Sequence, residues 1–359
     1  MEVNQFLPSI SYGDAVSNDA INIRRILHEK GYKSEIYVKH IHPDVAHCAY
    51  PLQRYKKNRD NVVLYHFSLA GGEVTEYIKA LPGKKGLIYH NITPPFFFRE
   101  FDLNFSDICS KGLNELSDLA PYFSLGIGDS EYNRLMLEKN GFCRTTILPI
   151  IIDWDTFIRS GERKVESYLE KTKVHLLFVG RIAPNKKIED LIRIFYYFHK
   201  TINHDSELYI VGNEQIPKYS QYLKQLTIIL GVDDAVFFTG QVSDDELHMY
   251  YKNADVYLCM SEHEGFCVPL LEAMHFEIPI IAYNATAIPY TLGNSGILIN
   301  YKKFQVIAEL IEIIVQDKSI RQRIIKKQRE RLDCFNPEIL TDQLIAIVED
   351  LSDVREKEG

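Results

Sequence analysis

The chain has 359 residues, 46% of them apolar and 25% charged, and its formal net charge is −8 at pH 7. This length exceeds what one hydrophobic core usually supports, so we expect two domains. The acidic balance argues against nucleic acid as a partner and against strong attraction to anionic lipid. The sequence shows neither an N-terminal signal pattern nor an apolar stretch near the ~20 residues of a membrane span, which predicts a cytoplasmic protein with at most peripheral membrane contact.

The six cysteines are scattered, with no C-x-x-C pair and no zinc spacing. In a chain without a secretory signal, this pattern is typical of reduced thiols in the cytoplasm. We interpret Cys267, which lies inside a motif described below, as a small buried hydrophobe rather than a reactive thiol.

Short apolar runs alternate with helical patterns through the first part of the chain. The predicted strands are Val3–Leu7, Ser34–Val38, Asn61–Tyr65, Lys85–Tyr89, Ser124–Ile127 and Thr145–Leu148. Between the first two, Asn18 to Lys30 repeats apolar side chains at helical spacing and is followed by Gly31, a usual helix stop. Strands separated by helices predict a parallel sheet with helices on both faces.

The same alternation restarts after a polar, charged segment, Asp153 to Thr172, which we interpret as the linker between the domains. The second set of predicted strands is Val174–Val179, Glu207–Val211, Ala235–Phe238, Val256–Cys259, Pro279–Tyr283 and Gly296–Ile299, with helices near Lys187–His199, Ser220–Leu230 and Ser243–Lys252. A last helix, Glu338 to Leu351, lies outside this set. Neither half contains a G-x-G-x-x-G turn, which argues against a nicotinamide dehydrogenase.

The most informative stretch is Ser-Glu-His-Glu-Gly-Phe-Cys-Val-Pro-Leu-Leu-Glu-Ala-Met, from Ser261 to Met274. It follows an apolar run typical of a buried parallel strand, and Pro269 is favoured at a helix start. A tight polar loop between a strand and a helix N-terminus forms an anion site, because free N–H groups and the helix dipole point at the turn. The positions expected to meet a ligand through this turn are Gly265, Phe266, Cys267, Val268, Leu270 and Leu271.

Two carboxylates flank this turn. Glu264 lies in the loop and Glu272 about one turn into the helix, with seven residues between them. A carboxylate beside a phosphate would repel it. We therefore expect both side chains to accept hydrogen bonds from hydroxyl groups, Glu264 from a sugar and Glu272 from a ribose.

A basic turn, Gly-Arg-Ile-Ala-Pro-Asn-Lys-Lys, follows the first strand of the second set. Its first residue, Gly180, allows close approach of the backbone. Arg181 and Lys186 bracket a Pro-Asn turn, so both cations can converge on one anion. We interpret Lys187 as a solvated neighbour.

The first half of the chain offers two candidate positions. His90 ends a predicted strand and opens a rigid turn, His-Asn-Ile-Thr-Pro-Pro, at the sheet edge where open α/β sheets bind ligands. Gly13 and Asp14 lie in the first strand-to-helix turn. Because an acidic side chain cannot sit against a diphosphate, Asp14 faces acceptor hydroxyls or Arg181, or is a simple turn residue.

Two other turns carry helix-cap patterns. Ser243 and Glu246 have the spacing of a capping box, just after Val242. Ser130 follows another predicted strand, and we expect it to cap a helix before it contacts any ligand.

The pattern Glu-Gly-Phe-x-x-Pro-x-x-Glu-Ala-Met, after an Ala-Asp-Val-Tyr-Leu strand, resembles the retaining GT-B glycosyltransferases of the family-4 type, the glycosyl transferases group 1. The resemblance implies an α/β fold of two Rossmann-like, doubly wound domains that face each other across a cleft. It implies an N-terminal acceptor-binding domain at 1–165 and a nucleotide-sugar-binding domain at 166–336. It also implies a C-terminal helix, 337–359, that crosses back to the N-terminal domain.

The resemblance also implies roles for the candidate residues. Arg181 and Lys186 would hold the donor diphosphate and stabilise the leaving nucleotide, and His90 would contact the donor sugar, commonly at its 6-hydroxyl. The backbone at Gly13 would reach the phosphates and that near Val242 the nucleobase. The family often has a second glycine where this chain has Asp14. Cations then supply the charge stabilisation, so no metal or other cofactor is expected.

The sequence therefore predicts a retaining hexosyltransferase that acts on a nucleotide diphosphate sugar and a saccharide or lipid-linked acceptor, in polysaccharide or glycoconjugate synthesis. UDP-glucose is the favoured donor and GDP-mannose the alternative. A sugar-nucleotide 2-epimerase would need further acid–base carboxylates, which the sequence does not identify. A non-catalytic sugar-nucleotide-binding protein is disfavoured by the intact set of charged residues. Regions His66–Thr75 and Phe96–Phe101 fall where acceptor-binding segments vary. The cluster Phe96-Phe97-Phe98 could stack a sugar or a lipid-linked acceptor, but we expect it to pack in the core or the domain interface.

Overall fold

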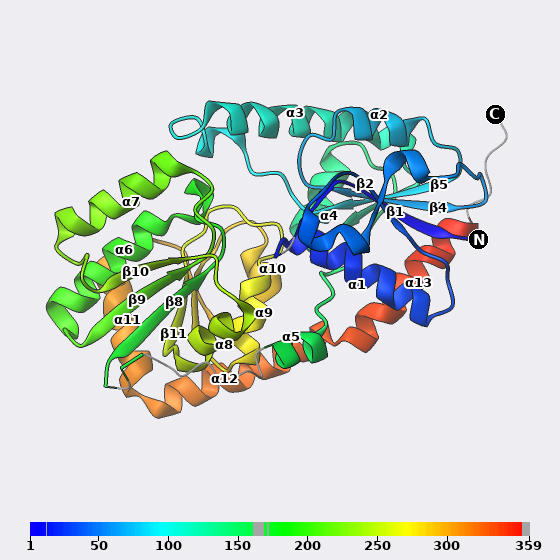
Figure 1. Ribbon diagram of the computed structural model, residues 1–359. Helices are drawn as coiled ribbons and strands as arrows, with labels where there is room; N and C mark the ends of the chain where they lie inside the picture. The colour runs from blue at the N-terminus through cyan, green and yellow to red at the C-terminus, as the bar shows by residue number, and fades with distance from the viewer. Residues whose placement is uncertain (12, 161–168, 171, 354–359) are drawn as a thin grey trace. The chain divides into compact units, whose positions relative to one another are not determined.

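The computed structural model describes residues 1–11, 13–160, 169–170 and 172–353, and the chain divides into two compact units (Figure 1). Unit 1 comprises Met1–Pro95, Asn104–Asp153 and Phe335–Gly359, and unit 2 comprises Phe96–Leu103 and Trp154–Cys334. The predicted linker, 153–172, and the predicted boundary after residue 165 fall largely on residues 161–168 and 171, which lie outside the described residues.

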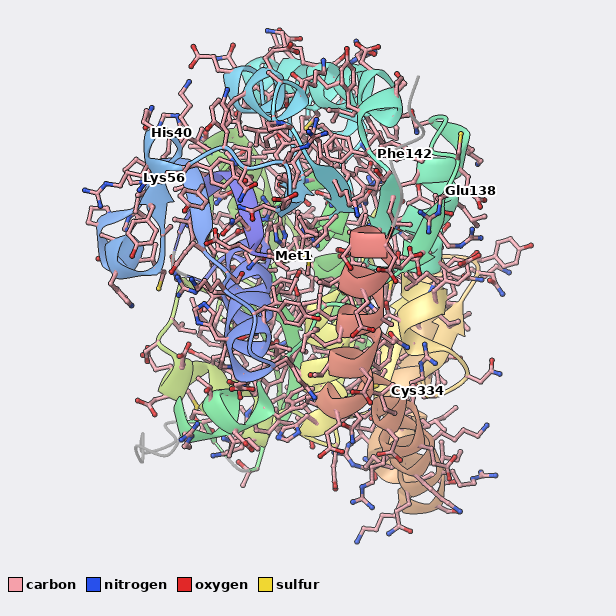
Figure 2. All side chains as sticks on the ribbon, turned by 90° about the vertical axis from the view of Figure 1, so that its right-hand side faces the viewer. Met1, His40, Lys56, Glu138, Phe142 and Cys334 are labelled. Carbon is pink, nitrogen blue, oxygen red and sulfur yellow. The ribbon has the colours of Figure 1, made fainter. Side chains whose placement is uncertain are left out.

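Unit 1 is built on a seven-stranded parallel sheet with the order β3-β2-β1-β4-β5-β6-β7. Its strands are β1 (Val3–Ile10), β2 (Ile36–Ile41), β3 (Tyr50–Pro51), β4 (Val62–Phe67), β5 (Lys84–Tyr89), β6 (Leu125–Gly128) and β7 (Thr145–Ile147). The strand order reverses between β1 and β4, and open α/β sheets bind ligands beside such a reversal, at the carboxyl ends of the strands. The exposed side chains His40 and Lys56 mark the surface of this unit near the short edge strand β3 (Figure 2).

The helices of unit 1 cover both faces of its sheet (Figure 1). They are α1 (Ala15–Glu29), α2 (Glu73–Lys79), α3 (Leu103–Leu119), α4 (Glu131–Lys139) and α13 (Pro337–Asp353), with 3₁₀ helices at Pro43–Cys48, Leu52–Arg54, Pro95–Phe97 and Ala120–Tyr122. α13 packs against β4, β5 and α1, so it belongs to unit 1 although it follows unit 2 in the chain.

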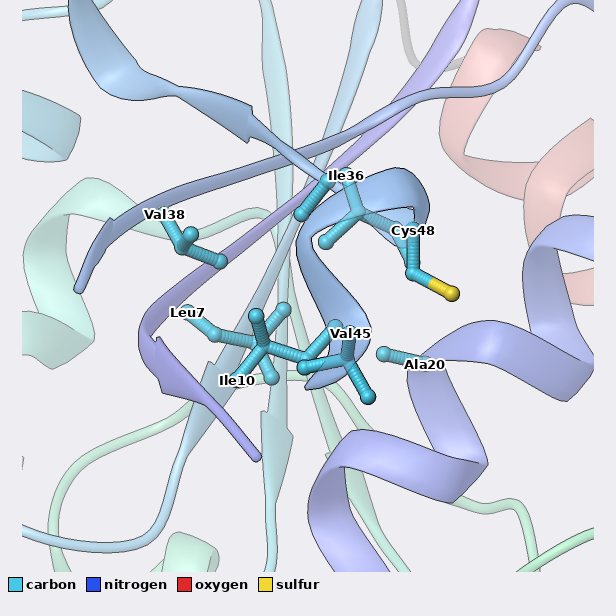
Figure 3. Packing of buried hydrophobic residues seen from close by; sticks show 8 residues of the cluster. Leu7, Ile10, Ala20, Ile36, Val38, Val45 and Cys48 are labelled. Carbon is cyan, nitrogen blue, oxygen red and sulfur yellow. The ribbon is translucent and has the colours of Figure 1, made fainter. Parts of the chain in front are cut away.

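A buried apolar cluster joins β1 and β2 to α1 and to the first 3₁₀ helix (Figure 3). Its members are Leu7, Ile10, Ala20, Ile36, Val38, Val45, Cys48 and Ala49. Burying an aliphatic side chain of this kind contributes roughly 1.5–3 kcal/mol. This cluster therefore holds β1 firmly, and with it the first turn of the chain that follows β1.

Unit 2 is built on a six-stranded parallel sheet with the order β10-β9-β8-β11-β12-β13. Its strands are β8 (Val174–Val179), β9 (Ser206–Val211), β10 (Val236–Gly240), β11 (Val256–Cys259), β12 (Ile280–Tyr283) and β13 (Ile297–Ile299). The reversal of strand order here lies between β8 and β11, which are the two strands that precede the basic turn and the Glu264 loop.

The helices of unit 2 are α5 (Trp154–Ser160), α6 (Ile188–Tyr197), α7 (Pro217–Leu230), α8 (Asp244–Asn253), α9 (Val268–His275), α10 (Ile288–Leu292), α11 (Phe304–Gln316) and α12 (Lys318–Leu332). A π-helical turn, Phe198–Ile202, extends α6, and 3₁₀ helices occur at Pro184–Lys186 and Asp333–Phe335. None of the helices in the described ranges combines the length and the apolar composition that crossing a membrane requires.

The predicted fold class, parallel α/β with two doubly wound sheets, is confirmed. Every predicted strand is present, with ends that differ by a few residues. β3 was not predicted, because its two residues carry no periodic pattern. The first helix begins at Ala15 rather than Asn18, because Asp14 is its N-cap. The helix predicted over Lys187–His199 leaves α-helical geometry after Tyr197.

Candidate functional site

In unit 2, the loops that follow β8 and β11 are tied together by Asn185. These strands are neighbours, with Val256 paired to Leu176. The Asn185 side-chain amide donates to the carbonyl of His263 at 2.9 Å, and the Glu262 N–H donates to the Asn185 carbonyl at 2.9 Å. Asn185 is buried, so these bonds are shielded from water. The sequence showed this residue only as part of a turn, and its bridging role was missed.

Lys186 and Glu264 form an ion pair between the same two loops. The Lys186 Nζ lies 2.6 Å and 2.5 Å from the two Glu264 carboxylate oxygens. The side chains are only 16% and 8% exposed, so water screens the pair weakly. From the sequence, Lys186 was assigned to a diphosphate and Glu264 to a sugar. Their direct contact was not predicted.

Arg181 differs from Lys186 because it is exposed. Within the described ranges its guanidinium has no ion-pair or hydrogen-bond partner. The preceding Gly180 lies where β8 and β9 approach closely: a Cβ on Gly212 would sit 2.0 Å from the Gly180 carbonyl oxygen. The backbone therefore delivers Arg181 to the carboxyl end of β8 as a cation with its donors available.

The loop from Glu264 to Cys267 is held by threonine side chains. The Glu264 N–H donates to Thr286 Oγ1 at 2.8 Å, and Thr291 Oγ1 donates to the Phe266 carbonyl at 2.5 Å. Cys267 adopts a left-handed backbone conformation, with φ of 73°, immediately before α9. This geometry fixes the half-buried backbone of Gly265 and Val268 at the start of the helix.

The side chains of Leu270 and Leu271 are fully buried in α9. They pack into the core of unit 2, as the buried face of a helix does. Only the backbone of this helix start can therefore meet a ligand, which agrees with the anion-site argument made from the sequence. The role itself stays a prediction.

Glu272 lies on α9, as predicted, where Tyr251 of α8 donates a hydrogen bond to its Oε2 at 2.6 Å. Removal from water raises the pKa of Glu272 to about 7, because burial disfavours the ionised form. Tyr251 was not identified from the sequence. Its hydrogen bond leaves the other carboxylate oxygen as the acceptor for a ligand hydroxyl.

Two thiols flank the Glu264 loop. Cys259 ends β11 and donates a hydrogen bond to Ser261 Oγ at 3.4 Å, while Cys267 is buried. Hydrogen bonding to Cys259 and burial raise the pKa of Cys267, which keeps it a thiol of low reactivity. Ligand atoms of Cys259, Glu264 and Cys267 lie within 4.8 Å of one another and could hold a soft metal ion, although Lys186 already supplies a cation to Glu264.

The helix caps predicted from the sequence are confirmed. Ser243 Oγ accepts from the Glu246 N–H at 3.3 Å, and the Glu246 carboxylate accepts from the Ser243 N–H at 3.0 Å. Ser130 Oγ accepts from the Asn133 N–H at 3.2 Å. These bonds account for the polar side chains beside Val242, which is half-buried after β10, so contact of its backbone with a nucleobase stays a prediction.

In unit 1, Asp14 has a structural role. Its Oδ2 accepts from the Ser17 N–H at 3.0 Å and from Ser17 Oγ at 2.9 Å, which caps α1. Of the interpretations that the sequence left open, the structure therefore favours the turn residue over a contact with acceptor hydroxyls or Arg181. Gly13, with φ of 71°, is exposed and provides the turn before this cap.

His90 is buried at the carboxyl end of β5, with a side chain only 2% exposed. Its Nε2 lies 2.8 Å from His66 Nδ1, and its Nδ1 lies 3.3 Å from Asp129 Oδ2. Both ring nitrogens therefore face protein groups, and the predicted contact with a sugar stays a prediction. His66 and Asp129 were not proposed as its partners, because nothing in the sequence shows that residues so far apart meet.

The phenylalanines of the segment Phe96–Phe101 differ in burial. Phe98 is 2% exposed and Phe96 is 60% exposed. Phe101 packs edge-to-face on Tyr219, with ring centroids 5.0 Å apart. The expected packing role fits Phe98, whereas Phe96 offers an exposed ring.

Two parallel, helix-covered sheets, each with polar loops at its strand-order reversal, define a protein of the GT-B class. Residues 161–331 match the family model described as glycosyl transferases group 1. This part of the chain is therefore similar to the glycosyl transferases group 1 family.

Similar proteins extend this comparison. The capsular polysaccharide biosynthesis glycosyltransferase CapM of Staphylococcus aureus is 30% identical over 173 residues, which cover 46% of this chain and 43% of CapM. O-antigen chain mannosyltransferase B of Escherichia coli is 25% identical over 171 residues, 48% of this chain and 44% of that protein. The chain thus spans less than half the length of these curated relatives.

A solved structure matches far more of the chain. Anabaena Alr3699/HepE in complex with UDP-glucose is 14% identical, with a TM-score of 0.76, over 98% of this chain and 100% of that one. At this identity the likeness shows the fold alone.

Proposed function

We propose that this chain is a retaining glycosyltransferase that moves a hexose from a nucleotide diphosphate sugar to a saccharide or lipid-linked acceptor in polysaccharide or glycoconjugate synthesis. The observation that carries the proposal is the junction of two loops in unit 2, where Lys186 pairs with Glu264 and an exposed Arg181 opens the same basic turn as Lys186. The match of residues 161–331 to the glycosyl transferases group 1 model supports it.

The chemistry of this junction suits a departing diphosphate. Glycosyl transfer leaves negative charge on the phosphate oxygen that departs from the sugar, and fixed cations stabilise such charge best in a weakly screened site. Arg181 can bind a diphosphate with its planar fork of donors, while Lys186 provides a point charge. Glu264, held by Lys186, can accept a sugar hydroxyl, and Glu272 a ribose hydroxyl.

In the proposed reaction, the bond from the anomeric carbon to the diphosphate breaks as the acceptor oxygen attacks on the same face. A donor phosphate oxygen receives the acceptor's proton. The side chains around the Glu264 loop bind and orient, and none needs to act as a nucleophile.

UDP-glucose is our first choice of donor. The likeness to HepE, whose structure was solved with UDP-glucose, supports this choice through the fold. GDP-mannose is the second candidate, because the mannosyltransferase among the relatives is 25% identical in this region. Both donors carry the diphosphate and the ribose that the proposed contacts need.

We also propose that the reaction needs no metal ion. Arg181 and Lys186 place two positive charges at the ends of the basic turn that follows β8, which is the role that a divalent cation has in other transferases of nucleotide sugars. A carboxylate that would recruit such a cation, Glu264, is already paired with an ammonium group.

The test is slow hydrolysis of sugar nucleotides, which reports the donor without knowledge of the acceptor. The protein is incubated with UDP- and GDP-hexoses, with and without EDTA, and release of UDP or GDP is measured. We expect release from UDP-glucose, unchanged by EDTA and abolished in Arg181→Ala. The matched control is Arg323→Ala, an exposed arginine of the same unit on α12. Loss of activity in EDTA with recovery in Mg²⁺ would refute metal independence, and no release from any donor would refute the transferase.

A further inference from the structure

Unit 1 contains a chain of polar side chains that crosses four neighbouring strands. Hydrogen bonds join Gln5, His66 and His90, and an ion-pair contact joins His90 to Asp129. Gln5 lies on β1, His66 on β4, His90 just after β5 and Asp129 just after β6, and these strands are adjacent in the sheet. His66 Nε2 is 2.8 Å from Gln5 Oε1, and His66 Nδ1 is 2.8 Å from His90 Nε2. His66 and Gln5 are completely buried.

The direction of each bond in this chain follows from its first member. The Gln5 amide nitrogen donates to the Ala20 carbonyl at 3.0 Å, so Gln5 presents its oxygen to His66. His66 must then carry its proton on Nε2, and in the neutral ring Nδ1 is the acceptor. His90 must therefore donate to His66 from Nε2.

The other nitrogen of the His90 ring, Nδ1, faces Asp129. A neutral ring protonated at Nε2 would leave the lone pair of Nδ1 buried without a hydrogen-bond partner and 3.3 Å from an Asp129 carboxylate oxygen, and the two would repel. A proton on Nδ1 turns this repulsion into attraction. Asp129 Oδ1 already accepts a hydrogen bond from Asn133 Nδ2, so the carboxylate is engaged as an acceptor and the proton is placed on His90.

The geometry of the two rings excludes a metal ion between them. The ring planes are within 4° of parallel and the centroids are 5.1 Å apart, while the facing nitrogens are 2.8 Å apart. These distances describe two rings placed end to end through one hydrogen bond. Although ligand atoms of Asp19, His66 and His90 lie within 4.8 Å of one another, the facing nitrogens point at each other and not at a shared ion.

We propose that His66 is a positioning residue that, as the neutral Nε2–H tautomer, holds His90 as a buried imidazolium paired with Asp129. This gives unit 1 a fixed positive charge at the carboxyl end of β5, where an open α/β sheet binds its ligand. The identity of the ligand rests on the proposed function: this charge attracts the anionic sugar nucleotide. His90 acts through its charge and through the position of its turn, because its Nε2 is engaged by His66 and its Nδ1 faces Asp129.

The charged groups around His90 favour this state. Asp129 faces it from the turn after β6, Asp19 and Asp14 from α1, and His66 from β4. Burial alone would lower the pKa of His90, but its contact with Asp129 and the charges of Asp19 and Asp14 raise it above 6.5. Burial and the neighbouring His90 lower the pKa of His66 well below 6.5. The imidazolium is therefore lost only as the pH rises through this raised pKa.

The deciding experiment reads the protonation states directly. Long-range ¹H–¹⁵N correlation spectra of the full chain, labelled at its 12 histidines, are recorded without ligand from pH 6 to pH 9. His90→Gln and His66→Gln assign the two signals. We expect His90 to show both nitrogens protonated at pH 7 and His66 to be neutral with its proton on Nε2. A neutral His90 at pH 7, or a His66 proton on Nδ1, would overturn the proposal.

Two substitutions separate positioning from simple packing. Gln at position 66 has both an acceptor and a donor, so His66→Gln should keep His90 charged, whereas His66→Leu should neutralise it by pH 8. Sugar-nucleotide affinity should fall about tenfold in His66→Leu, the usual size of one lost charged interaction, and less in His66→Gln. His40→Gln, an exposed histidine of the same unit, is the control (Figure 2). Equal losses in both variants, with His90 still charged, would show packing alone.

The outcomes also separate this inference from the proposed function. The protonation states are measured without ligand and decide the inference by themselves. If they are as expected but no sugar nucleotide binds the unaltered protein, the proposed function fails and the imidazolium stands.

Discussion

The two units place polar side chains at the carboxyl ends of their strands in opposite ways. In unit 2, Lys186 and Glu264 come from loops and are 16% and 8% exposed, and an exposed Arg181 opens the same turn as Lys186. In unit 1, His90 and Asp129 directly follow strands and are 2% and 3% exposed. The first arrangement can exchange its partners for a ligand, because it is less deeply buried and an exposed cation accompanies it. The second is fixed by its surroundings and can act only through its field and its shape.

The largest expected effect comes from removing Lys186. Lys186→Ala should lower the transfer or hydrolysis rate by on the order of 10²–10³-fold, because one preorganised cation at the leaving phosphate is lost. It also leaves Glu264 buried without its partner, which should cost about 3–5 kcal/mol of stability. Rate measurements at a temperature where the variant remains folded, checked by circular dichroism, separate the two effects.

A double-mutant cycle sharpens this prediction. In Lys186→Ala with Glu264→Gln, the unpaired carboxylate is gone, so much of the lost stability should return while the rate stays low. If the rate recovers together with the stability, Lys186 is a structural residue and the contrast between the units fails. Lys224→Ala, an exposed lysine of the same unit, should change neither quantity measurably.

Smaller effects are expected when Glu264 and Glu272 are substituted one at a time. Glu272→Ala should weaken UDP and UDP-sugar alike, by about tenfold, because a ribose contact is present in both ligands. Glu264→Gln should leave UDP binding nearly intact and lower the rate, because its charge matters as the sugar becomes positive. Calorimetric Kd values for the two ligands test this split. Equal weakening of UDP in both variants would contradict the assignment of sugar and ribose.

The smallest effect concerns pH. With a pKa of about 7, Glu272 is protonated below neutrality and ionised above it. A carboxylate accepts a hydroxyl proton more strongly than a carboxylic acid, so affinity for a UDP-sugar should rise about fivefold from pH 6 to pH 8. Titrations across this range in the unaltered protein and in Glu272→Gln provide the check. A rise that persists in the variant would assign the effect to another group.

The same shift has a consequence for stability. The folded pKa of Glu272 is raised above its ordinary value of 4.5, so the folded state holds a proton that the unfolded state releases first. This group's contribution to stability is therefore present below about pH 4.5 and is lost as the pH rises to about 7. Glu272→Gln should narrow the difference in melting temperature between pH 5 and pH 8.

The sequence placed the candidate residues of unit 2 on the correct loops and helix but showed little of the unit 1 network, for a physical reason. The candidate residues of unit 2 occupy two short turns, where local spacing shows a strand, a loop and a helix start. Glu264 and Glu272 could be placed because they are seven residues apart on a regular turn and helix. Their partners, Thr286 and Tyr251, come from other elements and required the fold.

In unit 1, the partners of His90 depend on strand order, which local patterns do not specify. His66 is 24 residues away and meets it only because β4 and β5 are neighbours. Asp14 shows the reverse error. Its local role as an N-cap follows from an Asp before a helical run, but the sequence analysis weighed a ligand contact equally with a simple turn residue.

The route of the chain sets the order in which this protein can be assembled. Proteins usually fold from the N-terminal end as synthesis proceeds. Here β4 and β5 lie exposed on one side until α13 is made, because α13 packs against them and Arg144 pairs with Asp350 at 2.6 Å. Unit 2, by contrast, is one continuous segment, Trp154–Cys334, apart from Phe96–Leu103. It can therefore fold before the last helix of unit 1 has been synthesised. During translation, synthesis of unit 1 thus begins first but its folding finishes last, and its exposed strands would need protection by chaperones.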